Sequence, residues 1–292
     1  MDLQSQKVEG SMSNHESEAI KQAQRRRAAW AKVEMARHPA RPSPTDFIKG
    51  IFTEFSEIHG DRAFGDDLAV GCGMAKLGTE QVMVIFTRRG RSLKERTKSN
   101  FGMPSPEGYR KALRCMKIAE KFGRPIICII DLLAAYPGPS SEERGQAEAI
   151  ARNLVEMSRL RVPTISAIVG QGGSGGALAL AVADRVLMLD NAVYFVAPPE
   201  FAASLMWKDP EQKHLAAEAL QISSSEVEAF DCVDEIVPEP PGGANTDPNQ
   251  AIGLFATALT KHLAEIQSIS IESLLARRRR KFRNIGQFYT EG

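Results

Sequence analysis

The spacing of apolar and polar residues along the chain predicts an α/β protein with additional helices at both ends. Apolar runs of strand length occur at 82–86, 126–130, 164–169, 185–189, 193–196 and 235–237. Apolar residues recur at helical spacing over 106–122, 140–159, 200–207, 211–221, 223–230, 249–266 and 271–283. Ser140 or Ser141 can cap the second of these helices. The alternation of strands with helices is typical of the α/β class.

The N-terminal 60 residues have a different pattern. Residues 1–24 are polar and lack periodicity, which predicts a flexible tail. We expect a short helix over 25–37 and a second helix over 45–59. The predicted organisation is therefore a tail, N-terminal helices over 25–60, and one domain with C-terminal helices over 61–292.

Composition and charge limit the classes of function. Of the 292 residues, 43% are hydrophobic and 25% are charged, as in ordinary soluble proteins, and the formal net charge is +1. We expect a cytoplasmic protein without membrane contact, because no leader sequence or membrane-spanning apolar stretch is recognisable. Near-zero charge disfavours a nucleic-acid partner, so the arginines over 277–283 are expected on a solvated helix. Four cysteines without C-x-x-C spacing predict reduced structural thiols and no metal site in this chain.

The most informative motif is the glycine-rich segment 170–177, Gly-Gln-Gly-Gly-Ser-Gly-Gly-Ala, between a strand and a short helical run over 177–183. Its glycines leave backbone N–H groups open to a ligand, and a helix starting there adds unpaired amides and a positive dipole end. Such a segment stabilises negative charge, either on a phosphate or on an oxyanion that forms in a reaction. The alternative interpretation is a tight turn whose glycines only permit close packing.

The same segment matches the dinucleotide-binding pattern G-x-G-x-x-G, and Asp190 follows at a distance suitable for a ribose-binding acid. A nicotinamide-dependent oxidoreductase is therefore an alternative enzyme class. Two features disfavour it. The helical run after the glycines is short for a crossover, and the motif lies behind two strand–helix units instead of in the first.

Longer segments carry a more specific resemblance. These are FGMPSPEGYRKAL at 101–113, EERGQAEAIARNL at 142–154 and PEPPGGA at 238–244, together with the glycine-rich segment. Over about 33–290 the chain resembles the carboxyltransferase α subunits of bacterial acetyl-CoA carboxylase. The resemblance implies a crotonase-like fold (ClpP/crotonase superfamily) of repeated ββα units. It also implies an α2β2 assembly with a zinc-ribbon β subunit, working with biotin carboxylase and a biotin carboxyl carrier protein.

The implied reaction moves a carboxyl group from carboxybiotin on the carrier to acetyl-CoA, giving malonyl-CoA for fatty acid or polyketide synthesis. It requires no side-chain nucleophile and no metal in this chain, but it requires N–H donors for the oxyanions that form. By the resemblance, these donors belong to Gly172, Gly173, Gly175, Gly176 and Ala177, with Gly176 and Ala177 the first choice. The implied substrate and biotin pocket comprises Ala134, Ala135, Tyr136, Pro137, Gly138, Glu200 and Phe201.

Two groups of charged residues have competing interpretations. The basic stretch over 88–98 can hold CoA phosphates, chiefly through Arg88, Arg91 and Lys94, or can steer an acidic carrier domain. The alternative is a solvated helix face. We interpret Glu107 and Glu143 as helix-start carboxylates and not as an acid/base pair. The basic stretch comprises Arg88, Arg89, Arg91, Lys94, Arg96 and Lys98.

Two departures from the family pattern fall beside the implied pocket. Where the family has Asp-Thr-Pro-Gly-Ala-Tyr-Pro-Gly, this chain has Asp-Leu-Leu-Ala-Ala-Tyr-Pro-Gly over 131–138, and Phe201 stands where the family has glycine. The loss of a proline and a glycine predicts a differently shaped, more apolar turn. Three hypotheses follow: an inhibitor-insensitive paralogue, an enzyme retuned for another acyl-CoA, or an inactive assembly subunit.

Overall fold

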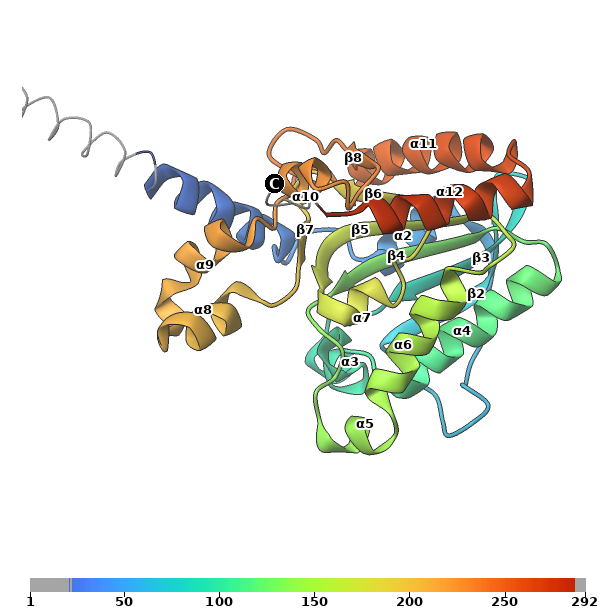
Figure 1. Cartoon of the computed structure of the whole chain (residues 1–292), viewed down its shortest axis with the longest axis horizontal. Coiled ribbons are helices and arrows are strands. Elements are labelled where there is room, and N and C mark those ends of the chain that lie inside the picture. Colours follow the sequence, from blue (N-terminus) through green and yellow to red (C-terminus); the bar gives the residue numbers. More distant parts are fainter. Residues whose placement is uncertain (1–20, 22, 287–292) are drawn as a thin grey trace, which may run out of the picture.

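The computed structural model describes residue 21 and residues 23–286, so the predicted tail over 1–24 lies almost wholly outside the described residues. The described chain contains one eight-stranded sheet in the order β1-β2-β3-β4-β5-β6-β8, and β7 pairs with the last residues of β5 (Figure 1). The β1–β2 and β2–β3 pairs are antiparallel, and the later pairs are parallel. The strands are β1 Thr53–Glu57, β2 Val70–Leu77, β3 Glu80–Thr87, β4 Ile126–Leu132, β5 Thr164–Gly173, β6 Arg185–Leu189, β7 Val193–Phe195 and β8 Glu235–Val237.

Helices surround this sheet and extend from one end of it. A helix over 23–36, called the N-terminal helix below, precedes the others. The α-helices are α2 Pro44–Ile51, α3 Leu93–Lys98, α4 Pro106–Lys121, α5 Pro139–Glu143, α6 Gln146–Met157, α7 Ser174–Leu178, α8 Pro199–Trp207, α9 Lys213–Leu220, α10 Ser224–Ala229, α11 Pro248–Gln267 and α12 Ile271–Asn284. Two short 3-10 helices are η1 Asn100–Gly102 and η2 Pro210–Gln212.

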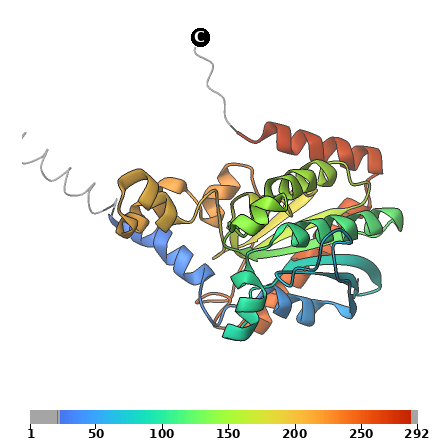
Figure 2. The ribbon, with the colours of Figure 1, turned by 90° about the horizontal axis from the view of Figure 1, so that it is seen from below.

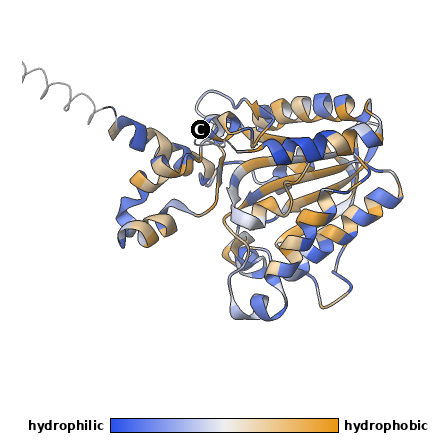
Figure 3. Ribbon diagram, viewed as in Figure 1, coloured by the Kyte–Doolittle hydropathy of each residue, from blue (hydrophilic) through white to orange (hydrophobic). Residues whose placement is uncertain are grey.

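Both faces of the sheet are buried, which explains the nearly continuous apolar runs of its strands. Successive residues of a strand point to opposite faces. Val84 therefore lies in the core formed with α2 and α11, whereas Met83 lies in the core formed with α4. Figure 3 shows apolar residues concentrated in the strands and polar residues along α12. The α/β arrangement predicted from the sequence is therefore present.

The helix predicted over 45–59 is wrong in its second half. Helix α2 ends at Ile51, and Phe52 is extended. Residues Thr53–Glu57 then form β1, which pairs with β2, a strand that the apolar pattern did not predict. The open backbone edge of β2 provides hydrogen-bond partners, and this pairing outweighs the helical spacing of the local sequence. The predicted boundary at residue 60 thus falls between two paired strands of one sheet.

The helix predicted over 140–159 is interrupted. Gly145 has a left-handed φ of 82° and separates α5 from α6. The predicted serine caps are also wrong, because Gly138 precedes α5 and Pro139 is its first residue. A proline is suited to this first position, where a helix needs no N–H donor.

The glycine-rich segment continues β5 instead of forming a loop. Residues Gly170–Gly173 are the buried end of the strand, and α7 after them has five residues. The helical run predicted over 177–183 is therefore shorter and begins earlier than expected. Most other predicted elements are found within a few residues, and the strand at 185–189 has the predicted bounds.

Helices α8 and α9 form a lobe at one end of the sheet, beside the N-terminal helix (Figures 1 and 2). Val33 of that helix packs with Ala217 of α9 and with Phe195 of β7. Arg26 donates a hydrogen bond to Glu218 of α9 at 3.0 Å. The N-terminal helix therefore braces the lobe against the sheet. No helix among the described residues is long and apolar enough to cross a membrane.

Candidate functional site

The glycine-rich segment packs directly against the turn that follows β4. A Cβ on Gly173 would overlap the carbonyl oxygen of Leu133. A Cβ on Gly176 would lie 2.7 Å from the amide nitrogen of Ala135, closer than real Cβ atoms approach. Glycine is required at both positions, because the two backbones are in contact. The predicted donors and part of the predicted pocket, Ala134 and Ala135, are thereby brought together.

The start of α7 carries backbone donors that the described structure leaves unpaired. The first N–H groups of a helix have no acceptor within it. No described acceptor bonds the amides of Ser174, Gly175 or Gly176, and the N-cap residue Gly173 supplies no side chain. The amide of Ala135, beside Gly176, is also without an acceptor in the described structure. Amides without acceptors therefore occur in both of these contacting segments, and N–H donors of this kind stabilise an oxyanion.

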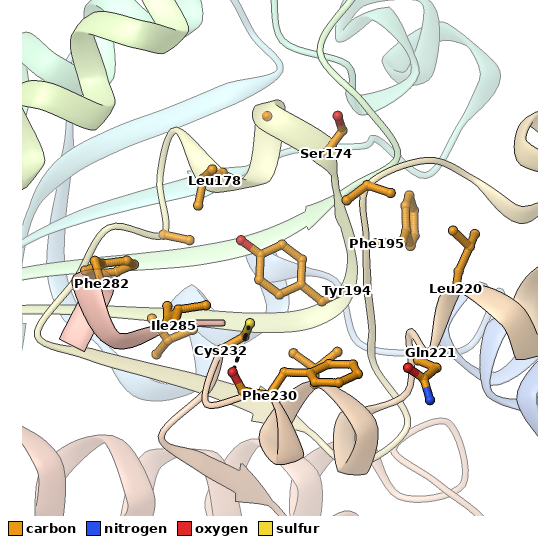
Figure 4. Close-up of a pocket in the computed structure, with 15 residues that line it drawn as sticks. Ser174, Leu178, Tyr194, Phe195, Leu220, Gln221, Phe230, Cys232, Phe282 and Ile285 are labelled. Atoms are coloured by element: carbon orange, nitrogen blue, oxygen red, sulfur yellow. Dashed lines mark hydrogen bonds between the residues drawn. The ribbon is translucent and has the colours of Figure 1, made fainter. Parts of the chain in front are cut away.

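Two cavities flank this segment. The first, called the Tyr194 cavity, has a volume of about 530 Å³ and adjoins Ser174 and Gly175. Figure 4 shows the Tyr194 ring near Leu178 of α7, with Cys232 on the opposite side. Burial raises the pKa of Tyr194, so its hydroxyl stays neutral. The walls are mostly apolar and come from segments far apart in sequence, from α7 to the end of α12.

The second cavity, called the α8 cavity, has a volume of about 520 Å³ and is lined by two of the predicted pocket residues, Glu200 and Phe201. Glu200 and Phe201 from α8 line it together with Leu133 and Gln171. Phe201 is 57% exposed, so its ring stands at the cavity wall and not in the core. The other predicted pocket residues do not line this cavity; they are Ala134, Ala135, Tyr136, Pro137 and Gly138. It is lined by Arg37, Arg89, Phe101, Met103, Asp131, Leu132, Leu133, Gln171, Pro198, Glu200 and Phe201.

Tyr136 and Gly138 instead shape the turn after β4. The Tyr136 amide donates to the carbonyl of Pro104 at 2.9 Å. Gln146 of α6 donates to the carbonyls of Pro104 and Tyr136 at 2.8 and 3.0 Å. A Cβ on Gly138 would overlap the Tyr136 ring. Pocket residues and turn-shaping residues are therefore adjacent in sequence, and the pattern did not separate them.

Arg37, just after the N-terminal helix, is a site residue that the sequence did not reveal. Its Nε donates to Gln171 Oε1 at 2.8 Å, and its other nitrogens donate to both carboxylate oxygens of Glu200 at 2.5 and 3.2 Å. Burial alone would raise the pKa of Glu200, but a backbone hydrogen bond, the hydrogen bonds from Arg37 and the charges of Arg37 and Lys213 together lower it. Arg37 lies 134 residues from Gln171, and no local motif marks the contact.

The charged residues singled out from the sequence have specific partners. Arg88 pairs with Glu57 at 2.9 Å and Arg91 with Asp46 at 2.7 Å, whereas Lys94 is exposed on α3. The carboxylate of Glu107, in the first turn of α4, accepts hydrogen bonds from Arg110 and Arg144.

Of the two glutamates expected at helix starts, Glu107 is found there, but Glu143 is the last residue of α5. Burial alone would raise the pKa of Glu107, but a backbone hydrogen bond, the hydrogen bond from Arg144 and the charges of Arg144 and Arg110 together lower it. An ionised Glu107 held by arginines has a structural role.

The dinucleotide-binding alternative does not fit this geometry. Its glycines would form a turn between the first strand and helix of a sheet ordered 3-2-1-4-5-6. Here the glycines end a central strand of a differently ordered sheet, and Asp190 accepts a hydrogen bond from Lys32 at 3.0 Å. Within residues 23–286 no group of histidine, cysteine, aspartate or glutamate side chains could hold a metal ion.

Solved structures share this fold. The 12S transcarboxylase with methylmalonyl-coenzyme A and methylmalonic acid bound superposes with a TM-score of 0.58 at 19% identity, covering 74% of this chain and 42% of that one. A Pseudomonas malonate decarboxylase hetero-tetramer in complex with coenzyme A gives a TM-score of 0.61 at 17% identity, covering 74% and 86%. The protein therefore has the crotonase-like fold of carboxyltransferases, as the resemblance implied.

Sequence relatives narrow this class. A family model described as acetyl co-enzyme A carboxylase carboxyltransferase-like matches residues 2–286. The acetyl-coenzyme A carboxylase carboxyl transferase subunit alpha of Geobacter metallireducens is 52% identical over 259 residues, 89% of this chain and 81% of the relative. The Thermus thermophilus subunit alpha is 49% identical over 259 residues, 89% and 83% of the two chains.

The chain belongs to the family of acetyl-coenzyme A carboxylase carboxyltransferase α subunits. The predicted enzyme class, a carboxyltransferase component of acetyl-CoA carboxylase, is confirmed. These comparisons lend no support to the hypothesis of an inhibitor-insensitive paralogue.

Proposed function

We propose that this chain, together with a β subunit, transfers the carboxyl group of carboxybiotin to acetyl-CoA and forms malonyl-CoA. Membership of the α-subunit family supports the need for a β subunit, and we propose an α2β2 assembly. A biotin carboxyl carrier protein and biotin carboxylase complete the proposed system. We also propose a cytoplasmic location, which the four free thiols support.

One observation carries the proposal: unpaired amides from two segments meet at Gly176 and Ala135. Removing a methyl proton from a thioester leaves negative charge on the carbonyl oxygen. Preorganised N–H donors stabilise such an oxyanion without having to reorient during the reaction. The contact between Gly173 and the Leu133 carbonyl holds the two segments in register. The start of α7 adds the positive end of a short helix.

The cavities beside these donors fit the remaining chemistry. Carboxybiotin supplies the activated carboxyl group when it is bound. Its ring system is compact and, apart from the urea and the anionic N-carboxylate, apolar, which suits a cavity that combines apolar and charged walls. The α8 cavity has this character, with Leu133 and Phe201 as walls and a volume within the ~300–1,000 Å³ range of small-molecule sites. Arg37 fixes this wall by tying Glu200 to Gln171.

The decisive experiment measures carboxyl transfer from carboxybiotin to acetyl-CoA by this chain co-purified with a standard β subunit. Gly176→Ala is expected to lower kcat by about 10²–10³, the typical loss of one oxyanion donor. The new methyl group would lie 2.7 Å from the Ala135 amide and force the two donor segments apart.

Gly253→Ala is the matched control, since a Cβ there meets nothing within 4 Å and the residue lies within α11. It should leave turnover unchanged and slightly raise stability, because alanine favours helices by about 1 kcal/mol over glycine. A Gly176→Ala enzyme with the wild-type rate would overturn the assignment of the oxyanion donors.

A second candidate is an assembly subunit that is inactive or retuned for another acyl-CoA. The exposed Phe201 ring on the wall of the α8 cavity supports this second candidate. A stable complex without turnover of acetyl-CoA would support this candidate. Rescue by Phe201→Gly would then place the obstruction at α8, and turnover of a longer acyl-CoA would indicate retuned specificity.

A further inference from the structure

A third cavity, called the α3 cavity, lies between the start of α2, the end of β3 and helix α3. Its volume is about 390 Å³. Five cations line it, against three carboxylates from Asp46, Glu57 and Glu95. The balance of charge is therefore positive, and the pairing of each charge decides what the cavity can bind. The cations are Lys49, Arg88, Arg89, Arg91 and Lys98.

All three carboxylates are already engaged. Glu57 pairs with Arg88 and Asp46 with Arg91. The Glu95 carboxylate accepts the backbone N–H groups of Arg91 and Ser92 at 2.9 and 3.0 Å, as the carboxylate of a capping box. These contacts neutralise the acids locally.

Lys49, Arg89 and Lys98 have no carboxylate within ion-pair distance among the described residues. The three come from three separate elements, α2, the segment after β3, and α3. Unpaired cations from separate elements around one cavity repel one another. Such an arrangement is stabilised when an anion binds between them.

The stem of Arg89 is held in place by a strained turn. A Cβ on Gly102 would lie 3.1–3.2 Å from the Arg89 Cα, Cβ and Cγ atoms, so the turn packs on the stem. The hydroxyl of Ser99 donates to the Arg89 carbonyl at 3.1 Å. Asn100 and Phe101 both have left-handed φ angles, 47° and 57°. Such strain persists where the surroundings enforce it, commonly at functional sites.

Arg89 also lines the α8 cavity, together with Leu133 and Gln171. The α3 cavity and the cavity beside the glycine-rich segment are therefore neighbours that share one guanidinium. Asp131 lines the α8 cavity as well, where the Arg89 charge acts on its carboxylate, which also accepts the Gln171 amide at 2.8 Å. An anion bound in the α3 cavity would therefore lie next to the α8 cavity.

We propose that Lys49, Arg89 and Lys98 form a phosphate-binding site that holds the phosphate groups of the acyl thioester substrate. This inference rests on the proposed function for its substrate, coenzyme A. Guanidinium and ammonium groups are the side chains suited to phosphate oxygens. The paired residues Arg88 and Arg91 form the frame of the site, and their charges are already neutralised.

The test combines a binding and a kinetic measurement on the full chain in complex with a β subunit. Calorimetry with inorganic pyrophosphate compares the wild type with the triple variant Lys49→Gln, Arg89→Gln, Lys98→Gln. We expect at least about tenfold weaker binding, the loss of roughly one charged hydrogen bond. The KM for acetyl-CoA should rise by a similar factor. The KM for acetyl-pantetheine, which lacks these phosphates, should not change.

A matched control removes three exposed arginines from α12, through Arg277→Gln, Arg279→Gln and Arg280→Gln. It lowers the net charge equally, so it separates a local site from a general electrostatic effect. Thermal unfolding of both triple variants verifies that they fold; if the first does not, Arg89→Gln alone replaces it.

Equal pyrophosphate binding by the wild type and the first triple variant would overturn the site. Equal losses in both triple variants would also overturn it, in favour of nonspecific attraction. Weaker pyrophosphate binding with an unchanged KM for acetyl-CoA would show that the site binds free phosphate anions but not the substrate. That result would overturn the substrate assignment. The binding measurement needs no turnover, so a failure of the proposed function is recognised separately.

Discussion

Two arginine-rich segments of this protein look alike in sequence and differ completely in structure. The segment over 277–283 lies on α12, where Arg278 is only 1% exposed. Its guanidinium donates to both carboxylate oxygens of Asp184 and to the carbonyls of Met157, Leu160 and Val162. The segment over 88–98 instead lines a cavity, and Arg89 has no ion-pair partner among the described residues.

The difference shows what decides the role of an arginine. A buried guanidinium must have all its donors satisfied, and Arg278 closes α12 against the chain between α6 and β5. The expectation of a solvated terminal helix was therefore wrong for Arg278, although its neighbours Arg277 and Arg279 are exposed. Arg89 has no such partners, and its charge remains available to a ligand. Charge alone does not distinguish the two roles.

The largest effect is expected from breaking the buried pair. Arg278→Ala should lower the free energy of unfolding by about 3–5 kcal/mol, because it leaves the Asp184 charge buried and unpaired. Urea unfolding followed by circular dichroism measures this loss. The neighbouring Arg279→Ala should change stability by no more than about 0.5 kcal/mol, as for exposed surface positions. Equal effects of the two substitutions would contradict the contrast between buried and exposed arginines.

A smaller effect is expected when a paired arginine is converted into a free one. Asp46→Asn keeps an oxygen acceptor for the amide of Ser43 but removes the charge that neutralises Arg91. Pyrophosphate affinity should rise by about threefold, in keeping with the strength of an exposed ion pair. Glu228→Gln, an exposed acid away from the α3 cavity, serves as the control for net charge. Unchanged pyrophosphate affinity in Asp46→Asn would show that the Asp46–Arg91 ion pair does not limit anion binding in the α3 cavity.

The smallest effect is expected at Lys94. It lies on the same helix as Lys98 and was predicted from the sequence to bind CoA, but it lines none of the three cavities described above. Lys94→Gln should change pyrophosphate affinity and the KM for acetyl-CoA by less than about twofold, because exposed charges at this distance are screened by salt. A tenfold loss of pyrophosphate affinity would show that Lys94 belongs to the binding site. It would contradict the distinction between cavity-lining and solvated cations.

Local patterns predicted the fold well where periodicity and burial agree. The strands at 126–132 and 164–173 appear as apolar runs because both faces of the sheet are covered. The secondary-structure prediction failed where pairing with a segment distant in sequence determines the conformation. Thr53–Glu57 has helical spacing but forms a strand, because β2 presents an open edge.

In the candidate site, too, local motifs were predicted and contacts between distant segments were not. The glycine-rich segment and the departure over 131–138 were visible as motifs, and the structure places them in contact. Arg37 and Lys49 were not identified as site residues, because their partners and cavities come from distant segments. Tyr194 was recognised only as part of a strand.

The α/β class, the family and the need for glycine at 173 and 176 could be predicted from the amino-acid sequence, because they depend on local periodicity, motif length and backbone freedom. Which cations are free could be read only from the folded chain. Arg88, Arg89 and Arg91 are near neighbours in the chain, yet Glu57 and Asp46 reach two of them and not the third. The reach of a carboxylate is a few ångströms, and only folding brings β1 and α2 within that distance.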